Sequence, residues 1–131
     1  MVNQNNDWDA IHKAAIEAMK KAYAPYSKFS VGVAARVNDG RIVTGCNVEN
    51  ASYGVGLCAE CGLVSNLILS GGGRLEAIVC VDANGDFLAP CGRCRQLLFE
   101  HGGPLAELMT PTGPQTLEAM LPWAFGPDNL D

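Results

Sequence analysis

Two short cysteine motifs in this 131-residue chain have residue types and spacing that could bind a metal. Residues 58–61 read Cys-Ala-Glu-Cys, and residues 90–94 read Pro-Cys-Gly-Arg-Cys. Thiolates are soft ligands that select zinc. Each motif stands where a loop is expected to enter a helix, and the free N–H groups and dipole of a helix start favour anions and lower the pKa of a thiol. The two motifs together predict a zinc site.

Two kinds of zinc site fit these motifs. In a closed structural site the metal is bound by Cys58, Cys61, Cys91 and Cys94, and two Cys-x-x-Cys pairs are typical of such sites. In an open catalytic site Cys61 is not a ligand, and water takes the fourth position, where zinc lowers its pKa. Glu60 could then move protons between that water and a substrate. A structural site has no use for this carboxylate, which favours the open site.

The six cysteines are expected to stay reduced. Residues 1–7 lack the basic and apolar regions of a signal peptide, which indicates a cytoplasmic protein. Cys46 and Cys80 fall in expected strands, where cysteine usually packs as a small core residue. A redox role for the 90–94 motif would leave the 58–61 motif unexplained.

The composition limits which classes of protein this chain can belong to. The chain carries 14 Asp and Glu residues against 9 Lys and Arg, a formal net charge of −5, so it lacks the broad basic face that grips nucleic acid. No run approaches the roughly 20 apolar residues of a membrane span. The length lies within the usual range of about 100–200 residues per domain. Residues 1–131 are therefore expected to form one domain that binds neither nucleic acid nor a membrane.

Apolar periodicity and turn residues predict the elements that position the motifs. In chain order these are a helix at 8–24, strands at 29–37 and 42–48, a helix at 58–70, a strand at 75–81, a helix at 91–101, a weak strand at 105–110 and a helical turn at 116–121. Asn-Asp-Gly between the first two strands predicts a hairpin turn, and three glycines end the second helix. This order indicates an α/β or α+β sandwich around one mixed sheet.

Cys-Ala-Glu, followed from residue 90 by Pro-Cys-x-x-Cys-Arg-Gln, resembles the cytidine deaminase family, and more closely its small homotetrameric class that acts on free nucleosides. Three further blocks, at 24–32, 45–53 and 121–125, resemble the family's N-terminal, ribose-binding and C-terminal segments. The likeness runs from about residue 9 to residue 130. It implies a three-layer α/β/α sandwich around a mixed sheet of about five strands, and pockets shared between subunits.

The resemblance also implies a reaction and a role for each matched residue. Cys58, Cys91 and Cys94 would bind one zinc per subunit, with water or hydroxide in the fourth position. Glu60 would take a proton from this water, protonate N3 of the pyrimidine and help ammonia leave, so that cytidine and 2′-deoxycytidine become their uridine forms in pyrimidine salvage. The nucleoside contacts would be Phe29 packing against it, Asn47 and Glu49 on the ribose hydroxyls, the Ala59 N–H on the pyrimidine O2, and Phe125 closing over a neighbouring subunit's site.

The chain departs from the family directly after the catalytic carboxylate, where many relatives have Arg and this chain has Cys61. Three thiolates on Zn²⁺ carry a net charge of −1, and excess negative charge weakens the Lewis acidity that activates water. We hypothesise that Arg93 takes over from the missing Arg, assisted by Arg95 and by the two helix starts.

Two alternative functions stay open at this point. One is a relative such as a blasticidin-type deaminase, which acts on a modified cytosine nucleoside. Asn47 and Glu49 favour an ordinary ribose, but they leave the base undecided. The other is a structural zinc module in which Cys61 is the fourth ligand, so that the metal has no open position.

Overall fold

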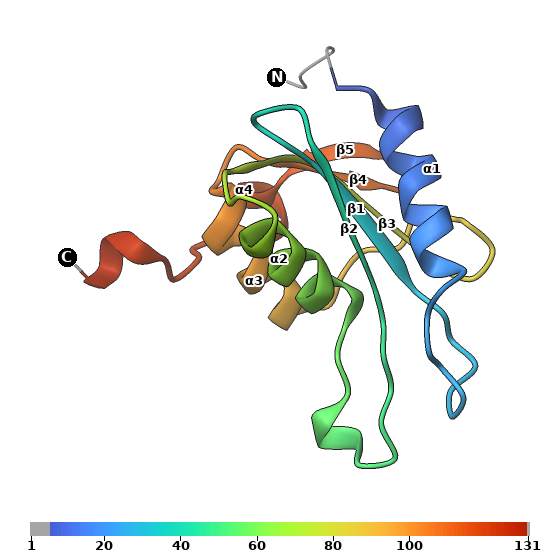
Figure 1. Cartoon of the computed structure of the whole chain (residues 1–131). Helices are drawn as coiled ribbons and strands as arrows, with labels where there is room; N and C mark the ends of the chain where they lie inside the picture. The colour runs from blue at the N-terminus through green and yellow to red at the C-terminus, as the bar shows by residue number, and fades with distance from the viewer. Residues whose placement is uncertain (1–5, 131) are drawn as a thin grey trace.

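Five strands form one mixed sheet at the centre of the protein (Figure 1). The computed structural model describes residues 6–130. The strands lie in the order β2-β1-β3-β4-β5, with β1 Gly32–Val37, β2 Ile42–Cys46, β3 Leu75–Val81, β4 Glu107–Thr110 and β5 Gly113–Thr116. β3 and β4 pair in parallel, and the other neighbouring strands pair antiparallel.

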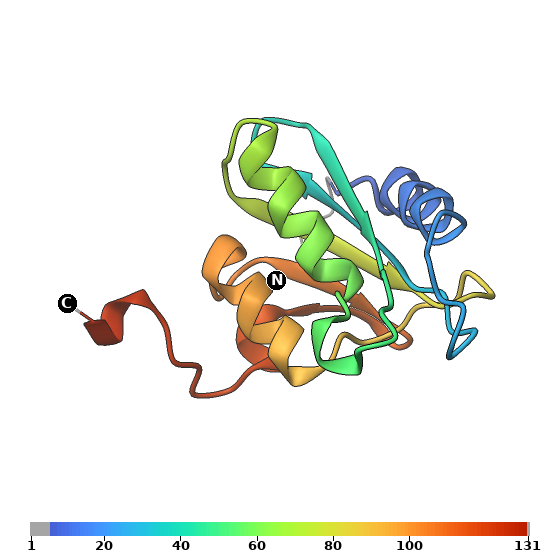
Figure 2. The same cartoon turned by 60° about the horizontal axis from the view of Figure 1, so that its bottom comes forward.

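Helices cover both faces of this sheet, as Figure 2 shows. Helix α1 (Trp8–Met19) packs on one face, where Ile11 and Val79 belong to one apolar core. Helices α2 (Ala59–Leu69) and α3 (Gly92–Gly102), with the short α4 (Leu117–Met120), pack on the other. A second core lies on this side, and strand β3 is buried along nearly its whole length because both of its faces are covered. The expected three-layer α/β/α sandwich with a five-stranded mixed sheet is confirmed.

The structure shortens the first expected helix and adds a strand. Helix α1 ends at Met19 rather than near residue 24, because the Tyr23 N–H bonds instead to the carbonyl of Asn47 at 3.0 Å. Strand β5 was missed in the sequence, since its Gly-Pro-Gln-Thr run contains two residues that are rare in strands. It is an edge strand, where proline is tolerated, and it forms through pairing with β4.

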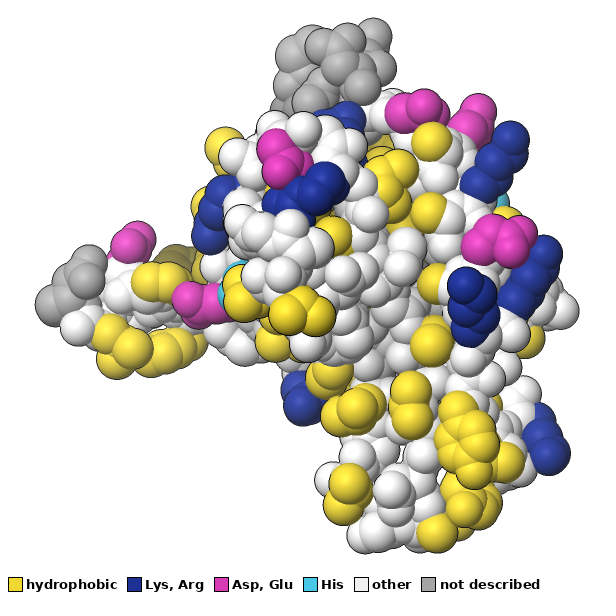
Figure 3. Space-filling view, in the orientation of Figure 1, with side chains coloured by type: hydrophobic (Ala, Val, Ile, Leu, Met, Phe, Trp, Pro, Cys, Tyr) yellow, Lys and Arg dark blue, Asp and Glu magenta, His cyan; other side chains and the backbone are white. Residues whose placement is uncertain are grey.

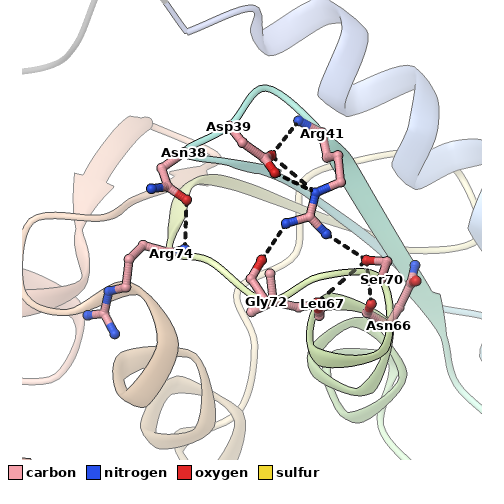
Figure 4. A network of polar contacts seen from close by, with 8 residues as sticks. All are labelled: Asn38, Asp39, Arg41, Asn66, Leu67, Ser70, Gly72 and Arg74. Atoms are coloured by element: carbon pink, nitrogen blue, oxygen red, sulfur yellow. Dashed lines mark hydrogen bonds and ion pairs between the residues drawn. The ribbon is translucent and has the colours of Figure 1, made fainter.

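A polar network ties the β1–β2 turn to the far end of α2 (Figure 4). The Arg41 guanidinium donates to Asp39 Oδ2 at 2.8 Å, to Ser70 Oγ at 2.7 Å and to the carbonyl of Gly72. The Asn38 side chain accepts a hydrogen bond from the backbone N–H of Arg74 at 2.9 Å. This network holds the C-terminal end of α2 on the sheet, while the other end of α2 carries the first cysteine motif.

Two glycines let helices touch the backbone of the sheet. A Cβ on Gly32 would lie 2.2 Å from the carbonyl oxygen of Ala15 in α1. A Cβ on Gly45 would lie 2.3 Å from the carbonyl oxygen of Ala59 in the first turn of α2. Because ordinary contacts of carbon atoms are about 3.5–4.0 Å, no larger residue fits at either position without movement of the helix.

The ends of the chain lie outside the described residues. Residues 1–5, on which most of the signal-peptide argument rests, and residue 131 are among them. Within residues 6–130, no helix has the length and apolar character needed to cross a membrane. The short 3₁₀ segments Tyr53–Val55 and Pro127–Leu130 complete the described elements.

Candidate zinc and nucleoside site

Three cysteine sulfurs meet where α2 and α3 begin. Cys58 immediately precedes α2, Cys91 immediately precedes α3, and Cys94 lies in the first turn of α3. Their Sγ atoms all lie within 4.8 Å of one another. Cys61 is outside this group, and its sulfur accepts a hydrogen bond from Arg93 Nη1 at 3.3 Å. Three soft sulfur donors at this spacing fit a zinc ion with an open position better than a closed four-thiolate site.

The three thiols have different electrostatic surroundings. Burial raises the pKa of Cys58 and of Cys94. The pKa of Cys91 is lowered, chiefly by the backbone N–H of Cys94 and also by that of Arg93 at the start of α3. The expectation that a helix start lowers a thiol's pKa therefore holds for Cys91, whereas burial outweighs it at the other two. A bound dication would supply the positive charge that thiolates in this pocket need.

Glu60 enters the same pocket from the first turn of α2. This residue is 3% exposed, and the Cys80 thiol from β3 donates to its Oε2 at 3.4 Å. The pocket has a volume of about 280 Å³, and Asn47 and Ala59 line it together with Glu60, Cys80 and the three clustered cysteines.

Cys80 is a buried core residue as expected, but it also lines the site, and Cys46 is only partly buried. The role of Cys80 was missed because its partner is 20 positions away in the chain.

Asn47 holds the segment that leads into β1. Its Oδ1 accepts from the backbone N–H of Val31 at 2.8 Å, and its Nδ2 donates to the carbonyl of Phe29 at 2.8 Å. Val31 also lines the pocket. Oδ1 can still accept one hydrogen bond and Nδ2 can still donate one, since an amide offers two lone pairs and two N–H donors.

Glu49 lines a second pocket, of about 440 Å³. Its Oε1 accepts from the backbone N–H groups of Tyr26 at 3.0 Å and Ser27 at 3.1 Å, and its Oε2 accepts from the Ser27 hydroxyl. The Ser27 hydroxyl is the main reason that the pKa of Glu49 is lowered. Tyr26 and Tyr53 line this pocket with rings 6.5 Å apart, a pair that no motif in the sequence indicated.

The two expected aromatic contacts are not part of either pocket lining. Phe29 is 51% exposed and Phe125 is 58% exposed. Phe125 lies in the segment after α4 that leads away from the body of the protein (Figure 1), and its carbonyl accepts a hydrogen bond from Gln96 Nε2 at 2.8 Å. In one copy of the chain, the structure therefore brings the three clustered cysteines together with Glu60, Ala59 and Asn47. It leaves the rings of Phe29 and Phe125 at the surface.

The two arginines of the second motif have different surroundings. Arg93 donates to Cys61, and this sulfur is the main reason that the pKa of Arg93 is raised, with smaller contributions from Cys58 and Cys94. The hydrogen bonds that the structure shows for Arg95 go to the carbonyl of Pro90 at 2.9 Å and to that of Met120 at 3.1 Å. Arg95 thus braces the loop before Cys91 rather than contacting a sulfur.

A three-thiolate cluster with a buried carboxylate beside it, at two helix starts on a mixed sheet, defines the class of zinc hydrolases with an open metal position. The family model described as "Cytidine and deoxycytidylate deaminase zinc-binding region" matches residues 5–107. The chain belongs to the cytidine deaminase family, and it is a zinc enzyme.

Individual relatives agree with this assignment. The cytidine deaminase of Mycobacterium tuberculosis strain H37Rv is 56% identical over 124 residues, which cover 95% of this chain and 93% of that protein. The crystal structure of cytidine deaminase from Mycobacterium leprae matches with 62% identity and a TM-score of 0.89, over 90% of this chain and 99% of that one. The M. tuberculosis crystal structure matches with 55% identity and a TM-score of 0.91, over 93% and 99% of the two chains. The resemblance to the cytidine deaminase family stated from the sequence is confirmed.

Proposed function

We propose that this protein converts cytidine and 2′-deoxycytidine to uridine and 2′-deoxyuridine by hydrolysis, with release of ammonia. The observation that carries the proposal is the convergence of three cysteine sulfurs and the buried Glu60 carboxylate in one pocket. Ligand pockets usually measure about 300–1,000 Å³. A pocket of about 280 Å³ suits the pyrimidine ring, with the ribose at its mouth.

Each residue of this pocket has a chemical task. When bound by Cys58, Cys91 and Cys94, zinc supplies a water of lowered pKa at neutral pH. Glu60 accepts a proton from that water and delivers it to N3 of the pyrimidine. As C4 gains the water oxygen, Glu60 takes the second proton from that oxygen and gives it to the amine. The C4–N bond then breaks, ammonia leaves and C4 keeps the oxygen as a carbonyl. Ala59, the first residue of α2, offers a backbone N–H that has no partner within the helix, and this group donates to the pyrimidine O2.

The ribose contacts use hydrogen-bonding capacity that remains on two side chains. A carboxylate has about four lone-pair sites, and Glu49 fills three of them with the Tyr26–Ser27 loop. The remaining site on Oε2 accepts from the 3′-hydroxyl. Asn47 keeps one N–H and one lone pair for a second hydroxyl. The exposed Phe29, whose carbonyl accepts from Asn47, packs against the nucleoside.

We further propose a cytoplasmic homotetramer of one-domain subunits, acting in pyrimidine salvage. The assembly is supported by a large exposed apolar surface at the lower end of the molecule in Figure 3. It belongs to two loops joined by bridges at Val48, and its exposed side chains are Tyr23, Tyr26, Phe29, Val48, Tyr53, Val55 and Leu57. Surfaces of this kind mark interaction sites. In the tetramer Phe125 closes over the pocket of a neighbouring copy.

The experiment that tests this function is incubation of zinc-loaded protein with cytidine, followed by the loss of pyrimidine ultraviolet absorbance. Conversion to uridine supports the proposal. If fully zinc-loaded protein leaves cytidine and 2′-deoxycytidine unchanged, modified cytosine nucleosides of the blasticidin type become the substrates to try. Failure with these as well would contradict the proposed reaction.

The three-ligand site predicts that Cys61→Ser keeps its zinc. Because the Cys61 sulfur lies outside the sulfur cluster and accepts from Arg93, a serine hydroxyl can take its place there. Metal analysis of the purified variant should give the wild-type zinc content. The matched control is Cys94→Ser, which removes a clustered sulfur and should lose most of the metal. Zinc loss from both variants alike would contradict the open site.

Arg93→Ala is expected to lower turnover much more than it lowers zinc content. The guanidinium donates a hydrogen bond to Cys61, near the three clustered sulfurs, and offsets the negative charge of those thiolates. Loss of such an outer partner of a metal site typically costs about 10- to 100-fold. Arg93→Lys retains the positive charge and should lose less. The measurement is kcat for cytidine beside zinc content, and unchanged turnover in Arg93→Ala would refute charge compensation by this residue.

A further inference from the structure

Cys80 makes a contact with Glu60 that neither metal binding nor packing in the core accounts for. It lies near the end of β3, is 1% exposed, and its Sγ is 3.4 Å from Oε2 of Glu60. A carboxylate can only accept hydrogen bonds when ionised, so the thiol is the donor. Burial, and after it the charge of Glu60, raises the pKa of Cys80, which keeps the proton on the sulfur.

This contact comes from a rigid part of the fold. Strand β3 is central in the sheet, and Cys80 pairs with Val33 of β1 in the antiparallel register. Cys80 and Val33 both belong to the core beneath α2 and α3. Glu60, by contrast, projects on a side chain with several rotatable bonds. Among the described residues, the Cys80 thiol is the side chain that the structure shows hydrogen-bonded to this carboxylate.

We propose that Cys80 is a positioning residue, whose thiol holds Oε2 of Glu60 and thereby leaves Oε1 to exchange protons with water and substrate. The inference rests on the proposed role of Glu60 in deamination. A proton carrier must stay within about 2.6–3.2 Å of the atoms that it serves. Cys80 limits the rotamers of the carboxylate and so raises the fraction of time that Oε1 spends within this distance.

Three substitutions separate hydrogen bonding from packing. Cys80→Ala removes the donor and leaves a small gap, Cys80→Val removes the donor and fills the space, and Cys80→Ser keeps a donor. We expect kcat for cytidine to fall by about tenfold in the Ala and Val variants alike, with KM unchanged. The free energy of one hydrogen bond then no longer favours the rotamer of Glu60 that places Oε1 near the reacting atoms. The Ser variant should restore most of kcat.

Controls exclude general damage to the fold or metal site. Zinc content and the thermal midpoint are measured for every variant. Cys46→Ala, a matched removal of a cysteine on β2 that lines a different pocket, against α1, should keep wild-type kcat. Wild-type kcat in both Cys80→Ala and Cys80→Val overturns the proposal, as does a Cys80→Ser variant no more active than they are.

A spectroscopic measurement tests the contact without turnover. The S–H stretching band of Cys80 in the zinc-loaded protein is assigned from its loss in Cys80→Ala. We expect Glu60→Gln to shift this band to higher frequency, because a neutral amide accepts a hydrogen bond more weakly than a carboxylate. An unshifted band would show that the thiol does not bind Glu60. Failure of the band shift is thus distinguishable from failure of the proposed deamination, which the cytidine assay of the wild type decides.

Discussion

Glu60→Gln is expected to reduce kcat for cytidine by about 10²- to 10⁴-fold, the usual contribution of a positioned proton carrier, while the zinc content stays that of the wild type. The amide has the same shape as the carboxylate but cannot accept and return a proton at neutral pH. Because Glu60 is buried in the pocket and is not one of the three clustered sulfur donors, its replacement leaves the metal ligands in place. Initial rates and metal analysis on the same preparation measure both effects.

The matched control for this substitution is Glu17→Gln. Glu17 lies exposed on α1, where it pairs with Lys20 at 3.1 Å, and it does not line the pocket. Its variant should keep wild-type kcat. Two results would contradict the proposed role of Glu60. Turnover retained in Glu60→Gln would mean that another group carries the proton, and loss of zinc together with turnover would mean that Glu60 supports the metal site rather than the chemistry.

Gly45→Ala is expected to cost both stability and most of the activity. The new Cβ would lie 2.3 Å from the Ala59 carbonyl oxygen and 2.5 Å from the Leu63 backbone nitrogen, so helix α2 must move away from β2. Overpacking of this kind costs about 1–3 kcal/mol. The first turn of α2 carries Glu60, and a misplacement of about 1 Å at a reacting group can cost about 10²-fold in rate.

Gly32→Ala is the matched variant on the other face of the sheet. Its Cβ would meet the Ala15 carbonyl at 2.2 Å, so the helix that has to move is α1, which carries none of the proposed site residues. We expect a similar drop in thermal midpoint and a much smaller loss of kcat for the folded protein. Equal losses of kcat in both variants would show that the rate does not depend on the placement of α2.

Much of the fold could be predicted from local signals. The Asn38–Gly40 turn forms as expected, and Gly40 has the positive φ of +96° that such a turn requires. The glycines at 71–73 all have positive φ and follow the end of α2. Strand β5 could not be predicted in this way, because its Gly and Pro disfavour a strand and its conformation comes from pairing with β4.

The sequence by itself determined which groups could do the chemistry in this protein. Soft sulfur donors and a carboxylate stand within three positions of two helix starts, and this spacing is enough to predict a zinc site and to make Glu60 the candidate proton carrier. The four matching blocks were enough to predict the family.

Only the tertiary structure decided which of these groups meet. It brings Cys58, Cys91 and Cys94 together, leaves Cys61 with Arg93, and places Cys80 against Glu60. It also turns Phe29 and Phe125 to the surface of a single copy. The physical reason is that helix starts and turns depend on neighbours in the chain, whereas these contacts depend on how α2, α3 and β3 pack, and packing is set by side chains far apart in sequence.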